Sequence, residues 1–318
     1  MTFETFQTLI LIIAAISLFV YGLQSFSQEI ENLGVDRLQK WIGKITSIPM
    51  GGFLLGGVVT AIIQSSTMVS SLTVSLVSSG VITFKESLLI LLGTNIGTTS
   101  TGWIVSFQSY LLGPIFIVLG TLISMIPTRI ATIGKSIFYF GFIFFSLSFI
   151  SQAMEPLRNN PMLIEILSKA SNPFLGILYG IVITVIIQSS SVVVGLVIIL
   201  ISQGIITLES AIPIVVGANV GTTSTALLVS FKLSPLSRLT ALSASTFNLV
   251  GVLLLLPFLG ILEWFVESVT LNPTIQVALA FTVSNTLTSV FFLIFLNPTM
   301  RLLQKHKWYK ESLQSKTS

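Results

Sequence analysis

Two short polar motifs each occur twice in this chain, and both consist of residues that bind ions through neutral atoms. QSS occurs at 64–66 and again at 188–190; it is followed by GTNIGTTST at 93–101 and by GANVGTTST at 217–225. Hydroxyl, carboxamide and backbone carbonyl oxygens coordinate small cations, and the free N–H groups at the start of a helix bind oxyanions. The motifs therefore indicate a site for ions rather than for covalent chemistry.

The sequence around these motifs is that of a membrane protein. Of the 318 residues, 53% are hydrophobic and only 8% are charged, whereas globular domains carry about 25% charged residues. So few charges cannot cover a surface that faces water, and we therefore expect the lipid bilayer to surround the chain. The prediction is an all-α polytopic membrane protein. The absence of cysteine excludes thiol chemistry.

The chain is a tandem duplication. A shift of 124 residues aligns 47–107 with 171–231 without a gap, and 30 of these 61 positions are identical. We expect a first repeat over 1–130, a second repeat over 131–300 and a basic cytoplasmic tail over 301–318. Each repeat then carries one copy of both polar motifs.

The apolar segments on either side of each QSS are too short to cross a bilayer. Each holds about 12 to 15 residues, or roughly 18–22 Å of helix, and the hydrocarbon core is about 30 Å thick. They predict a re-entrant helical hairpin with QSS at its tip, at about 48–80 and about 172–204. The second motif places glycines and polar residues inside a longer apolar segment. It predicts a broken transmembrane helix at about 87–107 and about 211–231.

Uninterrupted apolar segments predict further spans, two of which complete the second repeat. These segments lie at 6–26, 111–126, 136–150, 239–256 and 274–296.

The basic residues of the tail predict its side of the membrane. Lys and Arg concentrate in cytoplasmic segments, so Arg301, Lys305 and their basic neighbours predict that the C-terminus lies in the cytoplasm. We prefer this interpretation of the basic cluster to nucleic-acid binding. Counting spans back from the tail makes the first hairpin open toward the cytoplasm and the second toward the outside. The two repeats then have inverted topology, which is the layout of many secondary transporters.

An enzyme is not expected from the residues available. The only histidine, His306, lies in the basic tail, and no carboxylate pair or metal-ligand cluster falls in a predicted span. We expect no cofactor and no metal beyond a transported cation. Small residues also serve helix packing in membranes, but the glutamines and asparagines beside the clustered hydroxyls are not needed for packing.

Charged groups are missing where an anion would bind. Between Glu86 and Glu155 the only charged residues are Arg129 and Lys135, in a predicted loop. An anion at the motifs therefore depends on hydroxyls, amides, helix N-termini and any cation that enters with it. Because each ion offsets the cost of burying the other, the sequence favours binding of a cation and an anion together.

QSSS at 188–191 paired with GANVGTTST, duplicated in two halves, resembles the type II sodium–phosphate cotransporter family. The likeness is strong over 47–107 and 171–231. It implies a multi-pass plasma-membrane symporter that imports inorganic phosphate with the inward sodium gradient by alternating access. The implied phosphate-binding residues are Ser65, Ser66, Thr67, Ser189, Ser190, Ser191, Thr98 and Thr222. The implied sodium-binding residues are Gln64, Gln188, Asn95, Asn219, Thr99 and Thr223.

The chain departs from the family pattern at several positions. Family members often have a histidine shortly before an asparagine in the last two helices, but none precedes Asn248 or Asn285. Electrogenic animal members have an aspartate after the first NIGT, and 106–112 holds no acid, which implies an electroneutral cycle. The residues themselves leave two other functions open. These are a sodium-coupled carrier of another oxyanion, such as sulfate or a dicarboxylate, and a passive anion channel.

Overall fold

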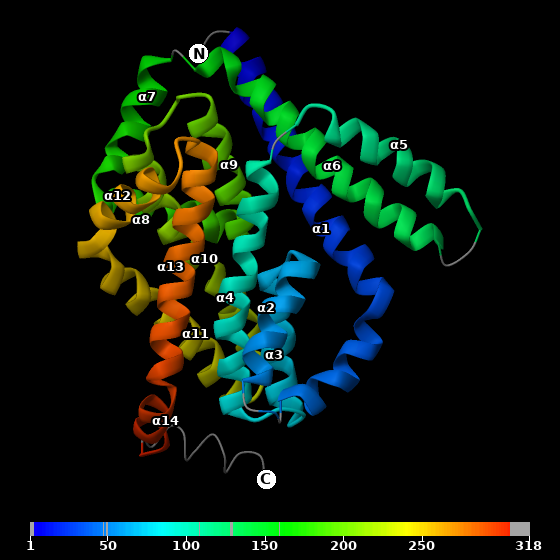
Figure 1. The fold of residues 1–318 in the computed structure, drawn as a ribbon, viewed down its shortest axis with the longest axis vertical. Coiled ribbons are helices and arrows are strands. Elements are labelled where there is room, and N and C mark those ends of the chain that lie inside the picture. Colours follow the sequence, from blue (N-terminus) through cyan, green and yellow to red (C-terminus); the bar gives the residue numbers. More distant parts are fainter. Residues whose placement is uncertain are drawn as a thin grey trace.

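The structure is a computed structural model that describes residues 3–46, 48, 50–107, 109–127, 130–158 and 160–305. All regular elements in these residues are helices (Figure 1). In chain order they are α1 (Phe3–Thr46), α2 (Gly51–Ile63), α3 (Ser66–Ser79), α4 (Phe84–Ser106), α5 (Leu112–Ser124), α6 (Ile130–Met154), η1 (Glu155–Leu157), α7 (Pro161–Ser168), η2 (Lys169–Ser171), α8 (Pro173–Ile187), α9 (Ser190–Ser202), α10 (Leu208–Ser230), α11 (Pro235–Leu255), η3 (Leu256–Phe258), α12 (Leu259–Val269), α13 (Pro273–Ile294) and α14 (Leu296–Lys305).

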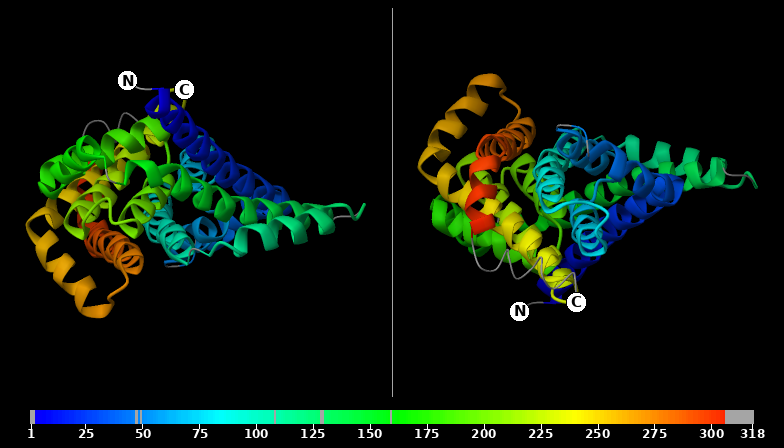
Figure 2. Two further views of the ribbon diagram at one scale, coloured as in Figure 1. Left: turned by 90° about the horizontal axis from the view of Figure 1, so that it is seen from above. Right: turned by 90° about the horizontal axis from the view of Figure 1, so that it is seen from below.

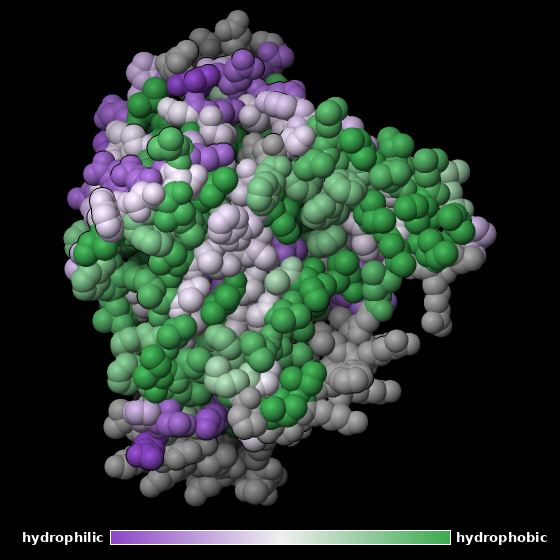
Figure 3. Space-filling model, viewed as in Figure 1, coloured by the Kyte–Doolittle hydropathy of each residue, from purple (hydrophilic) through white to green (hydrophobic). Residues whose placement is uncertain are grey.

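Six helical segments are long and apolar enough to cross a membrane, and a bent pair formed by α7, η2 and α8 adds a seventh if it counts as one span. On the face shown in Figure 3, hydrophobic residues form a broad band across the middle, and hydrophilic residues gather at the two ends. The prediction of an all-helical polytopic membrane protein is therefore confirmed. The six segments are Phe6–Leu33, Phe84–Ser106, Ile130–Leu157, Leu208–Ser230, Pro235–Val269 and Pro273–Ile294.

Two predicted spans differ from the observed helices. The span expected at 111–126 is wrong, because α5 has only 13 residues, or about 20 Å of helix, against the roughly 30 Å of a bilayer core. It packs closely on α6 instead: a Cβ on Gly120 would lie 2.2 Å from the Phe138 amide nitrogen. The span expected at 6–26 is the first half of a longer helix, since α1 continues without a break for 44 residues.

The break predicted in the second polar motif is also wrong. Both α4 and α10 run through the motif as continuous helices of 23 residues. Hydroxyls of the motif donate to carbonyls of their own helix, as Thr94 does to Ile90 O at 2.9 Å and Thr98 to Thr94 O at 2.8 Å. A side chain satisfied inside its helix does not have to end that helix. The polar motif therefore lies inside a continuous helix in both repeats.

The glycines of the motif serve close helix packing. A Cβ on Gly93 of α4 would lie 1.9 Å from Phe53 O of α2, and one on Gly56 of α2 would lie 2.1 Å from Ile90 O of α4. Side chains at these positions would push the helices apart, so only glycine allows this contact. The same contacts recur 124 residues later between α8 and α10, at Gly217 with Ile177 O (2.2 Å) and Gly180 with Ile214 O (2.0 Å).

The two short helix pairs occupy different parts of the body. In Figure 1 α2 and α3 lie in its lower half and α8 and α9 in its upper half, with α4 and α10 between them. Buried hydrophobic side chains join α1, α6, α9, α10, α12 and α13 into the largest core cluster, and a second cluster joins α3, α4, α11, α13 and α14. The α5–α6 pair projects from this body as an arm (Figure 2).

The predicted basic tail is described only in part. The last helix, α14, ends at Lys305. Residues 306–318, including His306, lie outside the described residues.

We predict that Gly56→Ala destabilises the protein by roughly 1–3 kcal/mol, because the added Cβ would overlap a backbone carbonyl of α4. The measurement is thermal unfolding of the purified protein in detergent. The matched control is Gly260→Ala, since a Cβ at that helical position meets nothing within 4 Å and alanine favours the helix. Equal melting temperatures for the two variants would contradict the packing described above.

Candidate functional site

Each QSS motif lies where one helix ends and the next begins. α2 gives way to α3 at 64–65, and α8 gives way to α9 at 188–189. The glutamine at each junction has a left-handed backbone, with φ of 61° at Gln64 and 60° at Gln188. Such a conformation costs a non-glycine residue about 1–3 kcal/mol, and glycine is the usual residue just past a helix end. A strained glutamine at both junctions therefore indicates that its side chain is needed there.

The serine after each glutamine caps the next helix. Ser65 Oγ accepts from Met68 N–H, and Ser189 Oγ accepts from Val192 N–H, both at 3.3 Å. The cap uses the serine oxygen as an acceptor, so the hydroxyl proton stays available for another partner. The first-turn N–H groups of α3 and α9 also have no acceptor within their own helices. Both tips therefore offer hydrogen-bond donors.

The two tips meet at a cavity of about 270 Å³, near the lower end of the range of about 300–1,000 Å³ for small-molecule pockets. Thr67 Oγ1 of the first tip donates to Gln188 O of the second tip at 3.3 Å. Helix α1 holds the first tip from the side, where Ser27 Oγ donates to Ile63 O at 2.7 Å. We call this space the tip cavity. Its polar lining is Gln24, Ser27, Gln64, Ser65, Ser66, Thr67, Ser71, Gln188, Ser189 and Ser191.

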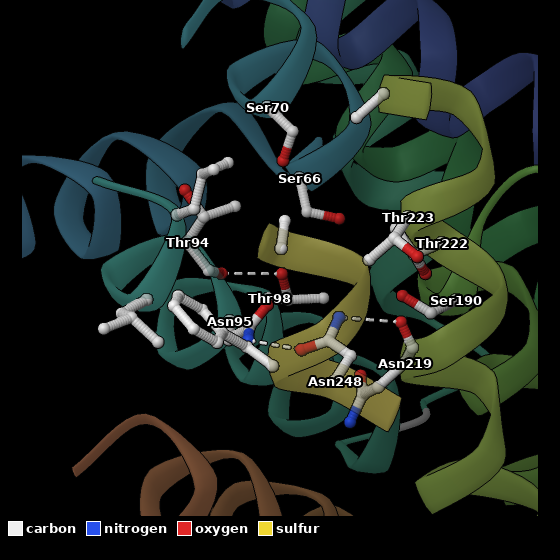
Figure 4. A pocket seen from close by; sticks show the side chains of 15 residues that line it. Ser66, Ser70, Thr94, Asn95, Thr98, Ser190, Asn219, Thr222, Thr223 and Asn248 are labelled. Atoms are coloured by element: carbon white, nitrogen blue, oxygen red, sulfur yellow. Dashed lines mark hydrogen bonds between the residues drawn. The ribbon is translucent and has the colours of Figure 1, made fainter. Parts of the chain in front are cut away.

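A second polar cavity, which we call the small cavity, lies among α4, α10 and α11 (Figure 4). Its volume of about 20 Å³ holds roughly one particle the size of a water molecule. Ser66 lines both cavities, so the two are neighbours. The polar lining of the small cavity is Ser66, Ser70, Thr94, Asn95, Thr98, Ser190, Asn219, Thr222, Thr223 and Asn248.

Asn248 of α11 connects the two equivalent asparagines of the repeats (Figure 4). Asn95 Nδ2 donates to Asn248 Oδ1 at 2.7 Å, and Asn248 Nδ2 donates to Asn219 O at 2.9 Å. Asn248 is buried, with 6% of its surface exposed. These bonds leave the carboxamide oxygen of Asn95 and the side chain of Asn219 available to the small cavity.

The threonines of the small cavity offer it only acceptors. Their hydroxyls all donate to carbonyls of their own helix, Thr98 at 2.8 Å, Thr222 at 3.2 Å and Thr223 at 2.8 Å. A hydroxyl has a single proton, so these oxygens have only lone pairs left for a ligand. A small cavity with such a lining favours a cation.

Two serines of the small cavity have hydroxyls without hydrogen-bond partners among the described residues. Ser66 and Ser190 are 8% and 1% exposed. Ser66 and Ser190 both line the small cavity, and their hydroxyls make no hydrogen bond with the described residues. Both hydroxyls are therefore free to bind a ligand in that cavity.

Neither cavity has a charged residue in its lining. Across the described residues, no three His, Cys, Asp or Glu side chains come together in a group that could hold a metal. Any ion bound here is therefore held by dipoles and by a partner ion.

The structure brings together every predicted site residue except one. Thr99 lines neither cavity, and its buried hydroxyl donates to Ile96 O at 2.7 Å. The two predicted sets are also mixed: the glutamines line the tip cavity, whereas Thr98 and Thr222 line the small cavity with the asparagines.

Asn248, which is not among the predicted site residues, lines the small cavity. The signal for it is a single carboxamide inside the apolar helix α11, a position where polar groups mark function. Serines beyond the motifs, such as Ser27 and Ser70, carry no comparable signal, because hydroxyls are common in membrane helices.

The chain is similar to one protein family and to several known proteins. The chain matches the family described as Na+/Pi-cotransporter over residues 18–152 and again over 153–283. It is 30% identical over 293 residues to the uncharacterized protein YqeW of Bacillus subtilis, covering 91% of this chain and 95% of YqeW. No solved structure matches it.

Two further relatives have functional names. The chain is 28% identical over 298 residues to the putative inorganic phosphate export protein YjbB of Escherichia coli, covering 92% of this chain but 55% of YjbB, so it spans about half the length of that relative. It is 36% identical over 139 residues to human sodium-dependent phosphate transport protein 2B, covering 39% of this chain and 20% of that protein.

We predict that Asn248→Leu lowers the free energy of unfolding by about 1–3 kcal/mol, because Asn95 Nδ2 loses its acceptor and the hydrogen bond to Asn219 O is lost. Thermal unfolding in detergent measures the effect. The matched control on the same helix is Thr246→Val, whose exposed hydroxyl bonds only to Leu242 O of its own helix. An Asn248→Leu protein as stable as this control would rule out a bridging role.

Proposed function

The chain belongs to the Na+/Pi-cotransporter family, and from that premise we propose that it imports inorganic phosphate together with sodium by alternating access. The family is one of transporters, not of enzymes. The observation that carries the proposal is the separation of donors and acceptors. Free hydroxyl protons and N–H groups gather at the helix tips, and the small cavity beside them is lined by threonine and asparagine oxygens together with the Ser66 and Ser190 hydroxyls.

Phosphate binds in the tip cavity. The Ser65 and Ser189 hydroxyl protons and the first-turn N–H groups of α3 and α9 supply donors there, and the start of a helix attracts an oxyanion through its dipole. The volume of about 270 Å³ leaves room for phosphate with part of its hydration shell. Ser66 adds a further free hydroxyl proton. Thr67, which donates to Gln188 O, and Ser191, whose Oγ pairs with Thr101 Oγ1 at 3.2 Å, line the phosphate site with their oxygens.

Sodium binds in the small cavity. Its volume of about 20 Å³ is too small for phosphate. Its threonine hydroxyls already donate hydrogen bonds to carbonyls of their own helix, so they can only accept from, or coordinate, a ligand. Asn95, Asn219 and the threonines are the oxygen ligands that a hard cation uses. Because Ser66 lines both cavities, the two ions bind as neighbours.

Coupling follows from the missing charges. Burying one ion without a counter-charge is costly in a lipid-embedded protein, and the linings supply none. Each ion is therefore the counter-ion of the other. A protein with no ion bound, or with both sodium and phosphate bound, can change the side of the membrane to which its site opens. A protein with only one of the two ions bound cannot.

Inverted re-entrant hairpins provide the alternating access. The pairs α2–α3 and α8–α9 consist of helices of 13 to 15 residues, about 20 Å each, so each pair enters and leaves by one face. Their places in the lower and upper halves of the body (Figure 1) support entry from opposite faces. The two tips then meet at mid-membrane depth, where transporters of this layout bind substrate.

We predict that purified protein in liposomes accumulates radiolabelled phosphate above equilibrium only with an inward sodium gradient. Replacing sodium by potassium, or collapsing the gradient with an ionophore, abolishes accumulation. Because the proposed cycle is electroneutral, a potassium diffusion potential leaves the initial rate unchanged.

The same assay separates the alternatives. Downhill phosphate flux without sodium identifies a passive anion channel. Stronger competition by sulfate or a dicarboxylate than by arsenate identifies a carrier of another oxyanion. Phosphate that leaves loaded liposomes with an outward sodium gradient, but never enters with an inward one, identifies export, the activity in the name of YjbB.

We predict that Gln64→Gly and Gln188→Gly each reduce sodium-dependent uptake to background. Glycine relieves the strained φ at both positions, so a loss of transport reports the side chain and not the backbone. The matched control is Met50→Gly, at the other non-glycine residue with positive φ (64°) among the described residues, which retains wild-type uptake. Normal uptake in both glutamine variants would contradict the site.

A further inference from the structure

The two repeats share one scaffold around their glutamines. Gln64 N–H donates to Thr60 O and Gln188 N–H to Thr184 O, and their φ and ψ angles agree within 1°. A Cβ on Gly97 would lie 2.7 Å from Thr60 Cβ, and its counterpart on Gly221 would lie 2.6 Å from Thr184 Cβ. Each glutamine is therefore held at the same place relative to the long helix of its own repeat.

The side chains of the two glutamines nevertheless differ. Gln64 is buried, with 6% exposed. Its Nε2 donates to Ser100 Oγ at 2.7 Å, and its Oε1 accepts from Thr101 Oγ1 at 2.8 Å. Gln188 is exposed, lines the tip cavity, and makes no side-chain hydrogen bond with the described residues. One glutamine is docked on its long helix, and the other is not.

The second repeat has the same two potential partners for Gln188, and neither of them binds its side chain. Thr225 is the counterpart of Thr101, and its buried Oγ1 has no hydrogen-bond partner among the described residues. Ser224 is the counterpart of Ser100; both donate to the carbonyl three residues before them at 2.7 Å. Ser224 thus keeps the acceptor lone pair that Ser100 uses to hold Gln64. The two groups that would bind a docked Gln188 are in place and unused.

We infer that Ser224 and Thr225 form a docking site for the Gln188 carboxamide in a second conformation of the transporter. Gln188 Nε2 then donates to Ser224 Oγ, and Gln188 Oε1 accepts from Thr225 Oγ1. The shared scaffold means that this exchange needs a rotation of the side chain and no shift of α8 against α10. The inference rests on the proposed function, because it assigns Ser224 and Thr225 as positioning residues of that transport cycle.

The exchange changes what the tip cavity offers to its ligand. Undocked, Gln188 adds a donor and an acceptor to the cavity wall. Docked, it withdraws both and leaves the donors of α3 and α9. Thr67 Oγ1 donates to Gln188 O, not to its side chain, so the backbone of the second tip stays attached to the first tip while the carboxamide moves.

The test uses Thr225→Val, which keeps the shape of the side chain and removes the hydroxyl. In the described conformation this change removes a buried group without a partner, so stability stays equal or rises. We expect the maximal rate of sodium-dependent phosphate uptake to fall at least about fivefold, with the phosphate KM within about twofold of wild type. Thr225→Ser restores the rate because it restores the hydroxyl.

Two matched variants separate positioning from structure. Thr101→Val removes a hydroxyl that is bonded in this conformation, so it lowers both the rate and the melting temperature. Ser230→Ala removes a buried hydroxyl of α10 that bonds only to Leu227 O, and it leaves the rate unchanged. A Thr225→Val protein with wild-type uptake, or one that loses rate only in proportion to its stability, overturns the inference.

A readout without transport keeps the inference separable from the proposed function. In protein labelled with ¹⁵N at glutamine side chains, the Gln188 amide signal is identified by its loss in Gln188→Leu. We expect this signal to move or broaden when sodium and phosphate are added to wild type, and to stay fixed in Thr225→Val. Identical behaviour of both proteins overturns the docking site. Wild-type protein without sodium-dependent uptake overturns the proposed function instead, whatever the signal does.

Discussion

The structure depends on how buried polar groups are satisfied where lipid, not water, surrounds the helices. A hydroxyl in a membrane helix has one proton, and most of those in α4 and α10 give it to a carbonyl of their own helix. That bond keeps the helix continuous and turns the oxygen into a pure acceptor. The serines at the helix starts are satisfied in the opposite sense, as acceptors from N–H groups. The acceptor of each hydroxyl proton therefore determines whether that hydroxyl can still donate a hydrogen bond to a ligand in the cavity.

Glycine packing fixes these groups in space. Contacts of a glycine on one helix with a carbonyl on the other hold α2 against α4, and the same contacts hold α8 against α10. The short helix of each repeat consequently ends at a defined height beside the long one. This is why a strained glutamine at each junction faces a Ser–Thr pair. The packing makes the site reproducible in both repeats, and the side-chain rotamers make the two copies unequal.

Much of this arrangement could be predicted from the sequence, because it depends on local patterns. The duplication, the short apolar segments around QSS and the residues of both motifs can be recognised directly in the amino-acid sequence. The continuity of α4 could not be predicted, because the same glycines and threonines that suggest a break also permit back-bonding and close packing. The length of α5 and the place of Asn248 depend on contacts between distant segments. The unequal states of Gln64 and Gln188 are invisible in two identical motifs.

Asn248 makes the two repeats unequal at the small cavity. Duplication supplied Asn95 and Asn219 as equals, but the residue that joins them exists once. It receives a side-chain proton from Asn95 and gives its own to the backbone of Asn219. One asparagine side chain is thereby pinned and the other is left to turn. The asparagine of the first repeat therefore has a side-chain partner in α11, and the asparagine of the second repeat has none among the described residues. The symmetry of the duplicated motifs is thus broken by a single amide in α11.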